Sequence, residues 1–235
     1  MSRPLFKLDD RLQMCASYVR QNAKLVDVGT DHAYLPIWLY KSGKIQNALA
    51  VDINKEPLKS GELTIEKYGV KGKIETRLSN GLQNVKKEEC SDVVIAGMGG
   101  ELIASIIENS KWVIDSKINL ILQPMSKPEK LREYLYNNNL EIIKEEAVKA
   151  DGKIYSVIMC SYSECCKSKE EITAKVKYMG KLKPSEKALD KEYVQKVLQM
   201  LEVKEKGLEK SKDVTQSDKI RKTIKTLEGS LKTKE

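Results

Sequence analysis

Several short apolar segments of this 235-residue chain end in glycines or in residues with acidic or amide side chains. Such residues could bind a nucleotide-like cofactor. In the first, LVDVGT at residues 25–30, an apolar run meets Asp27 and then Gly29. Strand, glycine turn and helix is the arrangement that holds such a cofactor at the carboxyl end of a parallel sheet. The later positions of a G-x-G-x-x-G motif are Asp31 and Tyr34, so the glycine that admits a pyrophosphate is missing and Asp31 would repel one. The sequence therefore predicts a nucleoside cofactor without phosphates.

An acidic residue ends the second apolar segment. Asp52 follows residues 48–51 and lies 23 positions beyond Gly29. At this distance from the glycine turn, a nucleotide-binding sheet presents a carboxylate to the two hydroxyls of a ribose. The same side chain could instead cap the helix that begins near Asn54. The combination with the first turn favours ribose binding.

An amide follows the third segment. Residues 72–78 alternate as a strand does and lead into Ser-Asn-Gly-Leu at 79–82. The side chain of Asn80 offers both a donor and an acceptor to an adenine edge. Asn-Gly is also an ordinary turn dipeptide, so both interpretations stay open.

The fourth segment, residues 91–98, runs into three glycines within four positions, Gly97-Met98-Gly99-Gly100. Glycines at a strand end let a flat ligand approach the backbone closely. Because the carboxyl ends of parallel strands meet at one edge of a sheet, the four strand ends are expected to line one crevice. That crevice would join Gly29, Asp52, Asn80 and Gly97.

A regular alternation of strands and helices is expected to position these turns. The expected strands are residues 25–28, 48–53, 72–78, 91–98 and 118–122, and the expected helices are 5–22, 33–39, 54–68, 101–110 and 128–137. Residues 140–148 and 153–160 then face each other across Asp151-Gly152, which is a hairpin signal. The pattern predicts an α/β sheet that is mainly parallel, with its last strands antiparallel.

The composition changes beyond Tyr162, where lysine and glutamate dominate. Two heptad-like seams predict an antiparallel hairpin of two long helices, the second capped by Thr215 or Ser217. We therefore expect two domains, residues 1–162 and 163–235. Residues 161–235 carry 19 Lys+Arg and 13 Asp+Glu, a net charge of +6 out of +8 for the whole chain. A basic appendage suggests a polyanionic partner, nucleic acid first, although a solvated lysine-rich face is the plain alternative.

Several classes of protein do not fit the composition. The chain has no apolar run of about 18 residues and no apolar signal-peptide core near its start, so we expect no membrane association. Five cysteines, an odd number, suggest no disulfide framework. No Cys/His spacing suits zinc, and the one histidine, His32, has no second histidine to join it, so we expect no metal. These features predict a cytoplasmic protein.

The segments DVGTDHAYLPI, AVDIN, SNGL and AGMGGELI resemble the motifs of class I S-adenosylmethionine-dependent methyltransferases. More closely, they resemble the bacterial tRNA adenine-N1-methyltransferases that modify position 22, in the D-arm region. The resemblance covers residues 3–160 and extends to a helical coiled-coil tail. It implies a Rossmann-like sheet, S-adenosylmethionine as cofactor, tRNA as partner, and a monomer or a weak dimer through the tail. Alternatives are a methyltransferase for another RNA position or substrate, a non-catalytic RNA-binding module, and an oxidoreductase on the same kind of sheet, which the missing second glycine disfavours.

The resemblance also implies residue roles. The first turn would cradle the methionine part of the cofactor, Asp52 would bind the ribose, and the adenine would lie beside Ile53. Met98 and Tyr34 would position the target base, and no general base is assigned because a ring nitrogen already has a lone pair. The absence of an NPPY-type tetrad agrees with attack by a ring nitrogen. The expected cofactor contacts are Arg11, Asp27, Gly29, Thr30, Asp31, His32, Asp52, Ile53, Asn80, Gly81, Leu82 and Gly97.

Two of these residues have plain structural alternatives. Arg11 lies in the first expected helix, near enough to the first strand's end to reach a ligand carboxylate, but it could be an ordinary exposed helix arginine. His32 could orient the cofactor or the base, or could make one backbone hydrogen bond at the helix start.

Overall fold

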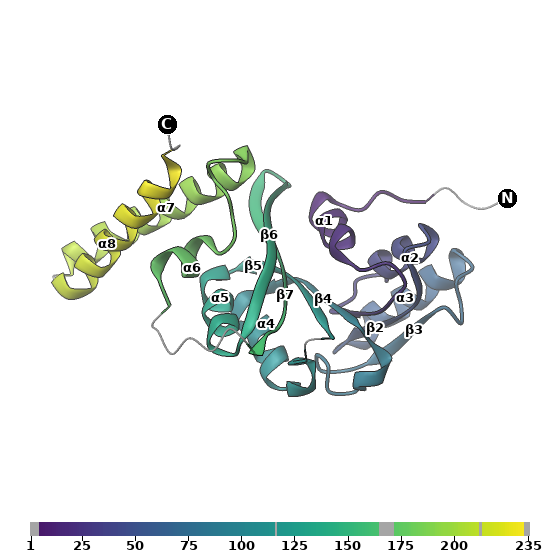
Figure 1. Ribbon diagram of the computed structural model, residues 1–235. Helices are drawn as coiled ribbons and strands as arrows, with labels where there is room; N and C mark the ends of the chain where they lie inside the picture. The colour runs from purple at the N-terminus through teal and green to yellow at the C-terminus, as the bar shows by residue number, and fades with distance from the viewer. Residues whose placement is uncertain (1–4, 116, 165–171, 212, 233–235) are drawn as a thin grey trace.

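The computed structural model describes residues 5–115, 117–164, 172–211 and 213–232, and these form one seven-stranded sheet with helices around it (Figure 1). The strand order is β3-β2-β1-β4-β5-β7-β6, in which β1 to β5 pair in parallel and β7 runs antiparallel to both of its neighbours. The predicted sheet and its closing hairpin are confirmed. The strands are β1 (Ala23–Val28), β2 (Ile45–Asp52), β3 (Ile74–Leu78), β4 (Asp92–Gly99), β5 (Asn119–Ser126), β6 (Leu140–Ala150) and β7 (Lys153–Tyr162).

Two hydrophobic cores cover the two faces of the sheet. Successive strand side chains point to opposite faces, so Leu25 packs in one core with Ile37, and Val26 packs in the other with Ile103. The helices divide accordingly: the first three contribute to the first core, the next two to the second. These helices are α1 (Asp10–Tyr18), α2 (Tyr34–Lys41), α3 (Lys55–Lys67), α4 (Gly100–Glu108) and α5 (Pro128–Asn137), and two short 3-10 turns are η1 (Lys87–Glu89) and η2 (Lys111–Val113).

The first helix is shorter than the predicted range of residues 5–22. Its start is fixed by Asp9, whose carboxylate accepts a hydrogen bond from the backbone N–H of Leu12 at 2.9 Å. Its end is fixed by Arg20, whose backbone N–H donates to the buried carboxylate of Asp92 at 2.8 Å instead of continuing the helix. Capping and a long-range contact therefore override the apolar periodicity at both ends.

The fifth strand is longer than predicted. It continues past residue 122 through Pro124 to Ser126, because β4 also continues through its glycines and pairs with it irregularly. The pairing shifts on either side of Met98, where Met98 faces Pro124. The glycine segment and the end of β5 therefore lie side by side.

The tail contains the predicted antiparallel helix pair and one helix that the sequence pattern does not predict. These are α7 (Ala188–Lys210) and α8 (Val214–Leu231), preceded by the short α6 (Ala174–Met179). The cap of α8 is neither Thr215 nor Ser217 but Asp213, which accepts from the backbone N–H of Gln216 at 3.1 Å, and Ser217 is buried inside the helix. Within the described ranges, no helix is both long and apolar enough to cross a membrane.

A buried polar network attaches the tail to the sheet. The guanidinium of Arg132, on α5, donates to Glu145 at 2.7 Å and to the hydroxyl of Tyr193 at 3.1 Å, and both partners are almost fully buried. Asp190 accepts from the backbone of Ala147 at 2.9 Å. The division at residue 162 stays a prediction, but the two expected domains share polar contacts as well as an apolar core between β6, β7 and the tail helices.

Candidate active site at the carboxyl edge of the sheet

The turn after β1 is fastened to the end of β2. The backbone N–H groups of Gly29 and Thr30 both donate to the carbonyl of Val51, at 2.8 and 3.1 Å. Gly29 has a φ of +75°, a conformation that glycine adopts without a steric penalty. The turn therefore has a fixed shape at the edge where a nucleotide-like ligand binds in this architecture.

The β4 turn reaches across to the β1 turn. A side chain at Gly29 would overlap the methyl carbon Cε of Met98, so these two strand ends are in contact at this point. Gly97 has a φ of +79°, and its N–H donates to the side-chain oxygen of Gln123 at 3.1 Å. The structure thus brings Gly29 into contact with Met98, the residue that follows Gly97 in the chain.

A buried carboxyl and an unpartnered hydroxyl lie under the first turn. Burial raises the pKa of Asp27 to about 6, against the effect of the neighbouring Thr30 hydroxyl and with a smaller contribution from the charge of Asp52. The Thr30 hydroxyl oxygen is buried yet makes no hydrogen bond of normal geometry with any described residue. Because a buried polar atom without a partner is costly, this hydroxyl is suited to a ligand's polar group.

Asp52 ends β2 as predicted and also makes a local turn. Its Oδ1 accepts from the backbone N–H of Asn54 at 2.7 Å, just before α3 begins, so the capping alternative is present in part. Next to it, Ile53 leaves 58% of its surface exposed. A carboxylate beside an exposed apolar side chain is the arrangement expected for a ribose next to an adenine.

The turn after β3 is held in shape by the hydrogen bonds of Ser79. Ser79 donates to the carbonyl of Gly81 at 2.8 Å and accepts from the backbone N–H of Asn84 at 3.1 Å, which leaves Asn80 exposed at the tip. The side chain of Leu82 is fully buried in the core, so its predicted contact with an adenine would be made by its backbone.

Arg11 does not project freely into solvent. Its Nη1 donates to the Oε1 of Gln123 at 3.1 Å and to the Sδ of Met125 at 3.2 Å, and its Nη2 pairs with Asp9 at 2.8 Å. The first helix is therefore linked to the end of β5 beside the glycine turn of β4. Sequence reasoning misses Gln123, although a signal is present, because it is a polar residue directly after an apolar strand.

His32 and Tyr34 form an aromatic cluster with the N-terminal segment. The two rings stack with centroids 5.3 Å apart, and Tyr34 also contacts the ring of Phe6 at 4.8 Å. The Nε2 atom of His32 lies 3.3 Å from Oδ1 of the exposed Asp31. Met98 lies instead over Gly29, so the two residues predicted to position the base have different surroundings. No group of three or more potential metal-binding side chains occurs within the described ranges.

The sheet order, the glycine turn of β1 and the acid at the end of β2 define a Rossmann-like methyltransferase. The family model described as "Methyltransferase domain" matches residues 8–158. The chain belongs to this family and, within it, to the tRNA (adenine-22)-N1-methyltransferases, with which it shares the following similarities.

The chain is 40% identical over 153 residues to the tRNA (adenine(22)-N(1))-methyltransferase of Bacillus subtilis strain 168. These residues cover 65% of this chain and 64% of that protein. The matched part thus spans just under two thirds of this curated relative. The crystal structure of the B. subtilis m1A22 tRNA methyltransferase TrmK is 30% identical, covers 97% of this chain and 100% of its own, and has a TM-score of 0.85. A putative m1A22 methyltransferase of Streptococcus pneumoniae, solved with S-adenosyl-L-methionine, is 31% identical, covers 94% of this chain and 98% of its own, and has a TM-score of 0.76.

Proposed function

We propose that the chain transfers a methyl group from S-adenosylmethionine to N1 of the adenine at position 22 of tRNA. One observation carries the proposal: the contact between Gly29 and Met98 joins the turn that would hold the cofactor to the turn that would border the target base. Membership of the methyltransferase family supports it. The reaction takes place in the cytoplasm, and the chain acts as a monomer or as a weak dimer through its tail.

The described residues fit this cofactor. The β1 turn receives the methionine part, with the unpartnered hydroxyl of Thr30 available to one of its polar groups. Asp52 accepts hydrogen bonds from the ribose hydroxyls, while the exposed side chain of Ile53 covers the adenine. Asn80, exposed at the tip of its turn, hydrogen-bonds the adenine edge. When bound, S-adenosylmethionine supplies an activated methyl group on a sulfonium.

Positioning is the main chemical task of the protein. Adenine N1 carries a lone pair and loses no proton when it is methylated, so no general base is needed. Holding the ring nitrogen in line with the methyl group can supply about 7–11 kcal/mol of the barrier reduction. Gly97 keeps the backbone close to this point, because no side chain stands between it and the ligand, and the side chain of Met98 forms an apolar wall.

The tail supplies cations for the tRNA backbone. Lys219, Lys222 and Lys225 lie exposed on α8 and pair with no acid among the described residues. Arg221, in contrast, is neutralised by Glu205 and Glu209, each at 2.8 Å. The unpaired lysines, spaced three residues apart, form a basic stripe that can follow phosphate groups.

Mass spectrometry of nucleosides tests the proposal directly. Unmodified tRNA with adenine at position 22 is incubated with protein and S-adenosylmethionine, and a transcript with guanine at that position serves as the control. Appearance of 1-methyladenosine in the first RNA alone is expected. N6-methyladenosine would contradict the regiochemistry, and tRNA binding without methyl transfer would favour the non-catalytic RNA-binding module.

A further inference from the structure

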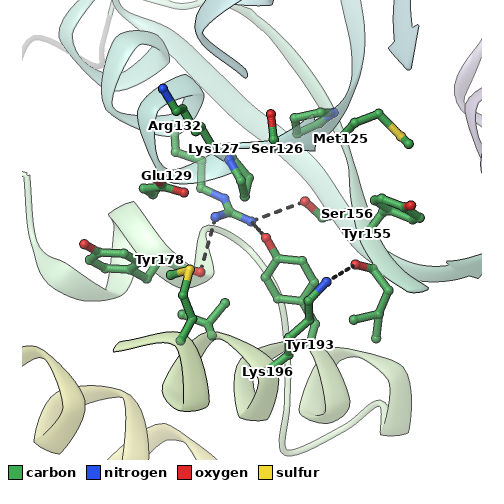
Figure 2. A pocket seen from close by; sticks show the side chains of 15 residues that line it. Met125, Ser126, Lys127, Glu129, Arg132, Tyr155, Ser156, Tyr178, Tyr193 and Lys196 are labelled. Carbon is green, nitrogen blue, oxygen red and sulfur yellow. Dashed lines mark hydrogen bonds between the residues drawn. The ribbon is translucent and has the colours of Figure 1, made fainter. Parts of the chain in front are cut away.

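A cavity of about 350 Å³ lies between the sheet and the helical tail (Figure 2). Met125 lines it from the end of β5, Lys127 from the junction of β5 and α5, and Tyr155 from the start of β7. Lys196 and Met200 line it from α7. The volume falls within the range of small-molecule sites. The cavity is therefore large enough to take a ligand the size of a nucleotide.

The cavity wall suits a flat aromatic ligand. Tyr178 lines it with a half-buried ring, Tyr155 and Tyr193 line it with buried rings, and Met125 and Met200 leave 42% and 49% of their surfaces exposed. Unpaired bases stack on aromatic rings, which accept any base because each has a π face, and a methionine sulfur can contact the edge of such a ring.

The cavity wall carries positive charge, which suits a ligand with a phosphate group. Lys196 is exposed and pairs with no acid among the described residues, Lys127 is exposed but pairs with Glu101, and Glu129 is the one acidic side chain of the described wall. Lys196 lies with its Nζ 5.9 Å from the centroid of the Tyr155 ring and donates to the carbonyl of Ile154 at 3.2 Å. An aromatic base with a phosphate attached matches this combination better than an apolar peptide or a lipid chain does.

The cavity is next to the methyl-transfer site but separate from it. Gly97, which belongs to that site, donates to Gln123, and Arg11 bridges Gln123 to Met125 on the cavity wall. Neither the β1 turn nor the β4 turn contributes to the wall. Since β7 is antiparallel to β5, its start lies at the same edge of the sheet as the strand ends of the site. A chain of nucleotides laid along this edge would reach both places.

We infer that this cavity binds an unstacked base of the tRNA next to the methylated adenine. The inference rests on the proposed function. Exposing the target adenine from a folded tRNA breaks stacking with its neighbours, which costs a few kcal/mol. A neighbouring base held by Tyr155, Tyr178 and Met200 offsets that cost and keeps the strand open. The cavity thereby selects RNA that can place two bases along the sheet edge at once.

A matched pair of substitutions on α7 tests the inference. Met200→Glu places a carboxylate at the cavity, whereas Val203→Glu places the same charge about one turn along the helix at a residue that is 72% exposed and does not line the cavity. We expect Met200→Glu to weaken tRNA binding about tenfold or more and Val203→Glu to weaken it far less. Affinity for S-adenosylmethionine should stay unchanged in both. Equal tRNA affinities for the two variants would overturn the inference.

Abasic tRNAs identify which base is bound. One transcript is made for each position beside the target, and one for the target itself, with the base removed. We expect one neighbouring abasic position to abolish the difference in affinity between the wild-type protein and Met200→Glu. Loss of the difference only at the target position, or at no position, would overturn the inference. If the wild-type protein binds tRNA without methylating it, the proposed function fails, while the same affinity comparison still decides the inference.

Discussion

The methyl carbon of Met98 occupies the space that a side chain on Gly29 would need. Gly29 directly follows β1 and Met98 lies near the end of β4, its neighbouring parallel strand, so the contact closes the site between the two glycine turns. Gly29 is therefore required for two reasons, its positive φ and this close approach. The two reasons can be separated by experiment.

Gly29→Ala should weaken S-adenosylmethionine binding, while its cost in unfolding free energy should match that of a control glycine substitution. The matched control is Gly43→Ala, because Gly43 has a similar φ of +71° but no neighbouring atom lies within 4 Å of the position that a Cβ would take there. Each substitution should cost about 1 kcal/mol of unfolding free energy from backbone strain. Only Gly29→Ala forces Met98 to move, so calorimetry with S-adenosylmethionine should show weaker binding for that variant alone. Equal affinities in the two variants would contradict this.

Asp52→Asn should lower cofactor affinity while leaving the local turn intact. An asparagine oxygen can still accept from the backbone N–H of Asn54, but it has no negative charge for the ribose hydroxyls. Hydrogen bonds to a charged group are worth about 1.5–3 kcal/mol, so we expect a loss of about tenfold or more in titration calorimetry. Asp151→Asn, at the hairpin tip, is the control and should bind the cofactor as the wild type does. An unchanged affinity for Asp52→Asn would exclude the ribose role.

Asp27 should make the protein less stable as the pH rises through 6. Burial raises its pKa from 3.8 to about 6, so the folded state holds its proton between these values while the unfolded state releases it. The stabilisation is complete below pH 4 and is lost as the pH passes 6. Asp27→Asn removes this dependence. The unfolding free energy of the variant minus that of the wild type should therefore rise by about 3 kcal/mol from pH 4 to pH 7. Urea unfolding at several pH values without cofactor measures the difference, and parallel profiles for the two proteins would refute it.

Arg132 should be essential for attaching the tail. Arg132→Met leaves Glu145 buried without its cation, which costs about 3–5 kcal/mol of unfolding free energy. Adding Glu145→Gln to that variant should recover part of the loss, because the uncompensated charge is then removed. The control is Arg221→Met, which also breaks ion pairs but at the surface, and it should change unfolding far less. Similar losses in Arg132→Met and Arg221→Met would show that burial does not govern the network.

The sequence predicts the parts of this structure that depend on local pattern. The apolar runs locate β1, β2 and β4, and Pro128 locates the start of α5. The contacts between distant segments are not predictable in this way. Nothing near Asp92 indicates that it ends the first helix through Arg20, and nothing near Gln123 indicates that Arg11 will meet it. The same limit applies to the network of Arg132, whose partners lie 13 and 61 residues away.

The stripe of lysines on α8 should contribute to tRNA affinity through charge. Changing Lys219, Lys222 and Lys225 together to Gln keeps the buried seam of the helix unchanged, whereas deletion of the tail would uncover Ile154 and the Arg132 network. We expect weaker tRNA binding and a salt dependence whose slope falls by about one for each phosphate that is no longer neutralised. The control changes Lys55, Lys59 and Lys71 to Gln, which removes the same charge near the opposite end of the sheet (Figure 1). The role of the stripe would be excluded if both triple variants bound tRNA with the same affinity and the same salt slope.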